Sequence, residues 1–140
     1  MYLRELKISN FKNIEEKEFS FSQINCFVGN NGVGKTNVLD AIYYLSFCKS
    51  FFNNNDFHSI RYEQDFFALH GDYSLNGVEE RISCTLKKEG KKQIKHSGKA
   101  YTRLSEHIGK IPTVMIAPND HILITGGSEV RRKFIDIIIS

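Results

Sequence analysis

The sequence lacks tryptophan and holds only two prolines and three cysteines among its 140 residues. The cysteines (Cys26, Cys48 and Cys84) are far apart and form no CxxC pair, so the sequence predicts neither a zinc site nor a disulfide framework. Free thiols are typical of a reducing compartment, and we therefore expect a cytoplasmic protein. Because prolines are so few, no Pro-rich linker divides the chain.

Long apolar runs are also absent. A membrane-spanning helix needs about 20 apolar residues, whereas the longest runs here, such as Ile137–Ile139, hold only a few. The opening residues MYLRELKISN are too charged for the apolar segment of a secretory signal. We therefore expect no membrane partner. Hydrophobic residues make up 41% of the chain, which is enough to build a core and disfavours a disordered chain.

Charge of neither sign dominates, since the formal net charge is only +3. Residues 87–99, here called the basic segment, depart from this balance because they contain six lysines and a single acid, Glu89. Clustered lysines displace counterions from DNA, which makes the basic segment a candidate for contact with the phosphate backbone. Lysines that protect the edge strand of a hairpin would give the same pattern, and that alternative stays open.

Hydrophobic periodicity predicts a chain that mixes strands and helices. The predicted strands are residues 2–8, 19–22, 24–28, 65–75, 78–86, 91–96 and 113–117, of which 24–28 and 113–117 are apolar enough for buried strands. We expect turns at Ser9-Asn10 and at Asn76-Gly77, where the second pair is a strong tight-hairpin signal. Helices are predicted at 35–48, at 102–108 and from Ser128 onward. In the first helix, the residues expected to share the buried face are Val38, Leu39, Ile42 and Leu45.

The most informative segment is residues 29–36, here called the phosphate loop, whose sequence GNNGVGKT matches G-x-x-x-x-G-K-[ST] at every fixed position. The predicted strand before it and the predicted helix after it are the context that this motif requires. That context disfavours a glycine-rich turn that merely caps a helix. The residues expected to bind nucleotide are Gly29, Asn30, Asn31, Gly32, Val33, Gly34, Lys35 and Thr36.

Each residue type in the phosphate loop suits a triphosphate. The glycines let backbone N–H groups converge on the phosphates, and the following helix adds its positive N-terminal end. Lys35 is expected to reach the β- and γ-phosphates as a point charge and is the candidate catalytic residue. The Thr36 hydroxyl would be a ligand of Mg²⁺.

The motif does not identify the reaction. The DxxG and NKxD motifs that small GTPases usually carry are absent, which disfavours a guanine-nucleotide switch protein. A P-loop phosphotransferase stays open as an alternative. Such folds usually run through alternating βαβ units, whereas here a predicted antiparallel meander follows the loop.

Several segments together resemble the RecF family of recombination and replication-repair ATPases, which are related to SMC and ABC-type proteins. They are residues 6–13 (LKISNFKN), 30–37 (NNGVGKTN), 38–50, 117–120 (APND) and 126–136 (GGSEVRRKFID). The resemblance covers essentially the whole chain. It implies an α/β P-loop NTPase fold, the first lobe of an ABC/SMC-like ATPase head, with a mixed sheet around the loop and an antiparallel β subdomain.

The resemblance also implies a function for the intact protein, namely ATP-dependent DNA binding in recombinational repair, replication and the SOS response to DNA damage. The implied cofactors are ATP and Mg²⁺. The implied partners are gapped duplex and single-/double-strand junctions, RecR-like and RecO-like mediator proteins, and a second copy in an ATP-dependent homodimer. ATP hydrolysis would be weak and DNA-dependent. Another SMC-like DNA-end ATPase stays open as an alternative.

We expect residues 1–140 to be the N-terminal part of this ATPase domain, with its second lobe absent, because the last helical pattern stops without a Gly or Lys/Arg stop signal. The Walker B carboxylates, the LSxG-type signature and the switch histidine of the family are not recognisable in the chain. The fragment alone is therefore not expected to hydrolyse ATP.

The sequence departs from the family pattern at three positions. Lys12 and Phe52 stand where arginine is usual, and Asn119 stands where an acid is common. Arg61 is the candidate to replace the second arginine, and Asp120 is the candidate to supply a carboxylate near the metal. By analogy with the family, Lys12 and Asn13 are expected to approach the nucleotide.

Overall fold

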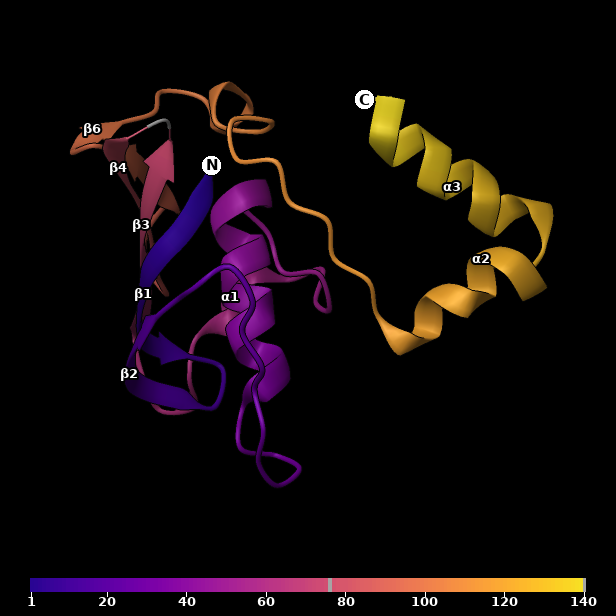
Figure 1. Ribbon diagram of the computed structural model, residues 1–140, viewed down its shortest axis with the longest axis horizontal. Coiled ribbons are helices and arrows are strands. Elements are labelled where there is room, and N and C mark those ends of the chain that lie inside the picture. Colours follow the sequence, from indigo (N-terminus) through magenta and orange to yellow (C-terminus); the bar gives the residue numbers. More distant parts are fainter. Residues whose placement is uncertain (76, 140) are drawn as a thin grey trace.

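The structure is a computed structural model that describes residues 1–75 and 77–139. Its body is a six-stranded antiparallel sheet with strand order β2-β1-β3-β4-β5-β6, and helix α1 (Lys35–Phe47) lies against one face of that sheet (Figure 1). The strands are β1 (Tyr2–Phe11), β2 (Ile14–Ser20), β3 (Phe66–Leu75), β4 (Val78–Lys87), β5 (Gln93–His96) and β6 (Lys99–Ala100). The antiparallel β subdomain expected from the sequence is therefore present.

The remaining elements are short or late in the chain. They are the 3₁₀ turns η1 (Asp56–Ser59), η2 (Leu104–Glu106) and η3 (Pro118–His121), and the helices α2 (Ile122–Thr125) and α3 (Ser128–Ile139). Helix α3 confirms the helix predicted from Ser128, whereas the helix predicted at 102–108 is reduced to η2. In Figure 1 the chain leaves the sheet through irregular residues 112–117 before it forms α2 and α3. No helix in the described ranges is long and apolar enough to span a bilayer.

The β3–β4 hairpin confirms the tight connection that the sequence predicts. Leu75 pairs with Val78, so two residues join the strands, and Gly77 has the positive φ of 83° that such a turn requires. The other residue of the predicted pair, Asn76, lies outside the described residues. The strand predicted at 91–96 is also confirmed, as β5.

The turn predicted at Ser9-Asn10 is wrong. Strand β1 runs on to Phe11, because Ser9 pairs with β2 on one side and with β3 on the other, and this double pairing outweighs the local turn preference. The turn falls instead at Lys12-Asn13, since Phe11 pairs with Ile14. This three-residue shift brings Lys12 and Asn13 to the tip of the β1–β2 hairpin.

The two buried strands predicted at 24–28 and 113–117 are also wrong for the described residues. Neither segment pairs with another strand there, and Ile24, Val28 and Val114 are between 88% and 89% exposed. A strand is stable only when a neighbour satisfies its backbone hydrogen bonds, and no described segment supplies one. Apolar composition alone could not reveal that missing neighbour.

The core lies between α1 and one face of the sheet. Phe11, Tyr44 and Phe67 meet edge to face, with ring centroids 5.3 to 5.9 Å apart. Helix α1 comes so close to β3 that a Cβ on Gly71 would lie 2.9 Å from Leu45 Cδ1. The glycine therefore sets the distance between helix and sheet.

The buried face of α1 differs from the predicted one. Val38 and Leu45 are buried as predicted, but Leu39 is 45% exposed, and Ala41 and Tyr44 take its place in the core. On another side of the helix Tyr43 stacks on Phe47 with ring centroids 4.4 Å apart. Helix α1 is thus apolar on two sides, and the described residues bury one of them.

Lys92 of the basic segment is part of this packing and is not free on the surface. Its ammonium group donates to the Cys48 carbonyl oxygen at the end of α1 and to Asp56 Oδ2, each at 2.5 Å. Asp56 also accepts from the Tyr44 hydroxyl at 2.6 Å, and the Lys92 side chain is only 14% exposed. Lys92 therefore joins the loop before β5 to the C-terminal end of the helix, where a cation is favourable.

The substitution Lys92→Ala should lower the free energy of unfolding by about 2 kcal/mol, because it leaves the partly buried Asp56 without its charged partner. Urea denaturation of the protein measures this change. The neighbouring Lys91→Ala is the matched control, since Lys91 is exposed, and it should shift stability by less than about 0.5 kcal/mol. Equal effects of the two substitutions would contradict the structural role of Lys92.

His107 makes the stability of the fold depend on pH. The residue is fully buried, Nε2 donates to the Leu45 carbonyl oxygen at 2.6 Å, and Nδ1 has no hydrogen-bond partner among the described residues. Burial lowers the pKa of His107 below its ordinary 6.5, more than the backbone hydrogen bond raises it. The unfolded chain thus takes up a proton at a higher pH than the folded chain.

The contribution of His107 should therefore be complete above its unfolded pKa of 6.5 and decline as the pH falls below it. Unfolding midpoints measured at about pH 7.5 and about pH 5 should differ, with the lower stability at the acidic pH. The His107→Gln variant should show a smaller difference. Burial also lowers the pKa of His70, so some acid sensitivity should remain. An undiminished pH dependence in the variant would contradict this assignment.

Candidate nucleotide-binding site

The phosphate loop joins the irregular residues 21–28 to the N-terminus of α1. Gly34 is the N-cap residue with φ 101°, and Val38 N–H donates to its carbonyl oxygen at 3.0 Å, which starts the helix. No side chain caps this end, and the first turn contains no acidic residue. The positive end of the helix dipole is therefore left uncompensated, as an anion-binding helix N-terminus requires.

The ammonium group of Lys35 lies inside the curve of the loop. It donates to the carbonyl oxygens of Gly29 and Asn30, each at 2.8 Å. These two contacts bend the lysine back over the loop, where it adds one positive charge to the uncapped helix end. The structure thus brings Gly29, Asn30 and Lys35 together in one curved loop, as predicted.

The β1–β2 turn contacts the loop from outside. Asn13 Nδ2 donates to the Gly32 carbonyl oxygen at 2.7 Å, and Asn37 Nδ2 donates to Asn13 Oδ1 at 2.8 Å. Two hollows meet at this turn, one of about 300 Å³ over the loop and one of about 790 Å³ beside β2. Asn13 thus contacts the loop and the first turn of α1, and its approach to a nucleotide stays a prediction.

Lys12 is committed to a buried ion pair. Its ammonium group lies 2.5 Å from Asp40 Oδ2 on α1, and the two side chains are 11% and 0% exposed. Asp40 also accepts from Ser50 Oγ and from the Phe51 N–H, each at 2.7 Å. Lys12 thus fixes the hairpin to the helix and lines neither of the two hollows at the phosphate loop. Sequence reasoning missed Asp40, since nothing distinguishes it from an exposed helical carboxylate.

The structure offers fewer candidate ligands for Mg²⁺ than for phosphate. The Thr36 side chain is exposed at the start of α1, within the hollow over the loop, so its hydroxyl fits the predicted role as a Mg²⁺ ligand. The described part of the chain holds no cluster of three potential metal ligands. Asp120 uses its carboxylate to accept from the Ala117 N–H at 2.6 Å, which caps η3. Arg61 pairs with Glu15 at 3.1 Å and borders the larger hollow.

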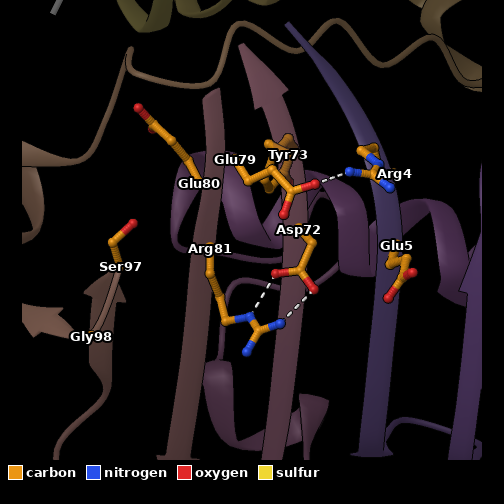
Figure 2. Close-up of a pocket in the computed structure, with 9 residues that line it drawn as sticks. All are labelled: Arg4, Glu5, Asp72, Tyr73, Glu79, Glu80, Arg81, Ser97 and Gly98. Atoms are coloured by element: carbon orange, nitrogen blue, oxygen red, sulfur yellow. Dashed lines mark hydrogen bonds and ion pairs between the residues drawn. The ribbon is translucent and has the colours of Figure 1, made fainter. Parts of the chain in front are cut away.

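Another hollow, of about 590 Å³, lies on the sheet face turned away from α1 (Figure 2). Figure 2 shows its two arginines turned toward acids, Arg81 toward Asp72 at 2.6 and 2.8 Å and Arg4 toward Glu79. The carboxylates that line it outnumber the arginines by four to two, since Glu5 and Glu80 lie there as well. A surface with this excess of negative charge repels phosphate, so it is no second nucleotide site.

Some lysines of the basic segment form ion pairs with described residues, and others form none. Lys92 is internal, and Lys88 pairs with Asp65 at 3.3 Å. The remaining lysines form no ion pair with any described residue, and they are Lys87, Lys91, Lys95 and Lys99. Four cations are thus left at the β4–β6 end of the sheet.

The sequence matches a known family of ATPase domains and several curated relatives. The family described as "AAA ATPase domain" matches residues 1–121. The DNA replication and repair protein RecF of Bacteroides fragilis is 53% identical over 142 residues, which cover 100% of this chain and 38% of that protein. RecF of Flavobacterium johnsoniae is 50% identical over 141 residues, or 39% of its length. The chain thus spans about two fifths of the length of these relatives.

Solved structures give the same result. The recombination mediator protein RecF with ATP, from the RecFOR pathway, superposes with a TM-score of 0.88 at 32% identity, over 99% of this chain and 39% of that one. An SMC ATPase from work on ATP-driven dimerisation superposes over 100% of both chains with a TM-score of 0.77, and at 18% identity it supports the fold alone. The resemblance to RecF is thereby confirmed over the whole chain, and the chain belongs to the family of AAA ATPase domains.

Proposed function

We propose that the intact protein is an ATP-dependent DNA-binding protein of recombinational repair and replication that acts in the cytoplasm. The observation that carries this proposal is the phosphate loop, in which Lys35 and an uncapped helix end face one hollow. RecF with ATP is a solved relative with the same fold, which supports adenine as the base.

ATP would be held mainly by backbone N–H groups of residues 29–36 and by Lys35. The bound Mg²⁺ would supply electrostatic stabilisation of the transferred phosphoryl group, and Thr36 would be its ligand from this chain. Thr36 is the one loop side chain that offers a hydroxyl. The carboxylates that complete the metal shell would come from other parts of the intact protein, so residues 1–140 alone should bind nucleotide without turning it over.

A further part of the polypeptide, the second lobe, would cover the apolar surfaces that the described residues leave open. These surfaces are the half-buried Tyr43–Phe47 side of α1 and the unpaired segments 24–28 and 113–117. Large exposed apolar areas of this kind mark interfaces. Pairing with strands of the second lobe would turn both segments into the mixed sheet expected around the loop.

DNA would bind through its phosphates and not through its bases. The unpaired lysines of the basic segment supply charge, while few aromatic side chains lie among them for stacking on bases. The preferred DNA would be gapped duplex and single-/double-strand junctions. The relatives named in the RecFOR pathway support RecR-like and RecO-like partners, and the SMC-like fold supports an ATP-dependent homodimer.

The substitution Lys35→Ala should weaken binding of Mg-ATP to the intact protein about 100-fold, equivalent to about 2.7 kcal/mol, because it removes the cation of the cradle. Isothermal titration calorimetry measures this change. Lys49→Ala is the control, since Lys49 is an exposed lysine beyond the other end of α1 and should leave affinity unchanged. Tight binding by the Lys35 variant would overturn the proposed function.

Lys95→Glu should weaken duplex binding by the intact protein and should reduce the slope of log affinity against log salt by about 1, because one phosphate contact is lost. Fluorescence anisotropy at several salt concentrations measures both quantities. Lys49→Glu makes the same change in net charge outside the basic segment and should leave the slope unaltered. Lys92 is unsuitable for this test, since its loss perturbs the fold. Identical salt slopes for Lys95→Glu and the wild type would exclude the basic segment as the DNA contact.

A further inference from the structure

Asn13 connects two parts of the nucleotide site that are remote from it in sequence. Its amide nitrogen donates to the Gly32 carbonyl oxygen, 19 residues away, and its amide oxygen accepts from Asn37, 24 residues away. The first contact lies in the middle of the phosphate loop and the second on the first turn of α1. One side chain therefore bridges the loop and the helix that follows it.

The contact with Gly32 matters because of how such a loop binds phosphate. When successive N–H groups converge on an anion, carbonyl groups of the same peptides turn outward and need other partners. Gly32 has φ 84°, a conformation that a residue with a side chain rarely adopts and that loop contacts must maintain. Asn13 supplies a donor to this outward-facing carbonyl oxygen.

Gly34 shows how tightly the turn packs on the loop. A Cβ at this position would lie 2.8 Å from Asn13 Oδ1 and 3.3 Å from Ile14 Cγ1. A side chain at Gly34 would therefore displace the Asn13 amide and press on the Ile14 side chain. The third glycine of the loop thus leaves space for the Asn13 amide, and its positive φ of 101° also favours glycine.

The turn that presents Asn13 is itself fixed. The Lys12 N–H donates to the Ser59 carbonyl oxygen at 2.8 Å, and the Lys12 ammonium group pairs with buried Asp40 at 2.5 Å. The Arg61 N–H donates to the Asn10 carbonyl oxygen at 2.9 Å. Asn13 is thus held in place by the sheet, by α1 and by the segment that leads to β3.

We propose that Asn13 is a positioning residue for the phosphate loop, with Asn37 as its partner. It holds the loop backbone in the shape that binds phosphate, and so lowers the cost of ordering the loop when a nucleotide binds. In this role Asn13 acts through its hydrogen bonds with Gly32 and Asn37. This inference rests on the proposed binding of ATP by the same loop.

The test uses Asn13→Ala in the intact protein, with Mg-ATP and inorganic tripolyphosphate as ligands. Affinity for ATP should fall about tenfold, equivalent to about 1.4 kcal/mol, and affinity for tripolyphosphate should fall by the same factor, because the loss lies in the phosphate cradle. The thermal unfolding midpoint without ligand should stay within about 2 °C of the wild type, since the affected hydrogen bonds are exposed. Asn54→Ala, which removes an exposed amide far from the loop in sequence, is the matched control and should change nothing.

A double-mutant cycle tests the pairing with Asn37. The Asn37→Ala variant should lose affinity to a similar extent, and the double variant should bind about as well as either single variant. Additive losses would contradict the bridge. Unchanged affinity of Asn13→Ala, or a loss for ATP without a loss for tripolyphosphate, would overturn the inference while the effect of Lys35→Ala leaves the proposed function standing. If the wild type binds no ATP, both fail.

Discussion

Helix α1 performs two tasks that make opposite demands on its surroundings. Its sides must be covered to hold it in place, and its N-terminus must stay uncovered to attract an anion. The structure meets both demands by packing Val38, Tyr44 and Leu45 on the sheet while Gly34 caps the helix without a side chain. The close approach permitted by Gly71 fixes the helix relative to β3. The position of the phosphate loop follows from that packing.

The buried ion pair between Lys12 and Asp40 fixes the β1–β2 hairpin to helix α1. Burial of two charges costs several kcal/mol unless their hydrogen bonds are satisfied. Here Asp40 accepts from Ser50 and Phe51 as well as from Lys12, so hairpin, helix and following loop share one polar network. Such a network favours one specific arrangement of its three segments, and the position of Asn13 against the phosphate loop depends on it.

The exposed apolar surfaces are consistent with the proposed function, in which a further part of the intact protein covers them. Helix α1 is apolar on two sides, and two apolar segments, 24–28 and 113–117, are unpaired among the described residues. The relatives are more than twice as long as this chain, and RecF is among them in a structure with ATP. In the proposed intact protein, the polypeptide that covers these surfaces would also bring the missing metal ligands to the loop. Folding of the second lobe would then complete the site at which ATP is hydrolysed.

The sequence by itself determined the phosphate loop, helix α1, the β3–β4 hairpin and the family, because each depends on a local pattern of residue types. Glycine spacing, helical periodicity and turn chemistry involve residues close together in the chain, so they can be predicted from the amino-acid sequence. Only the tertiary structure decided that Lys12 is internal, that Lys92 is structural and that Asn13 contacts Gly32. Those roles depend on partners that lie 28, 36 and 19 residues away, at Asp40, Asp56 and Gly32. The same reason explains the wrong strands at 24–28 and 113–117, since a strand exists only where another segment pairs with it.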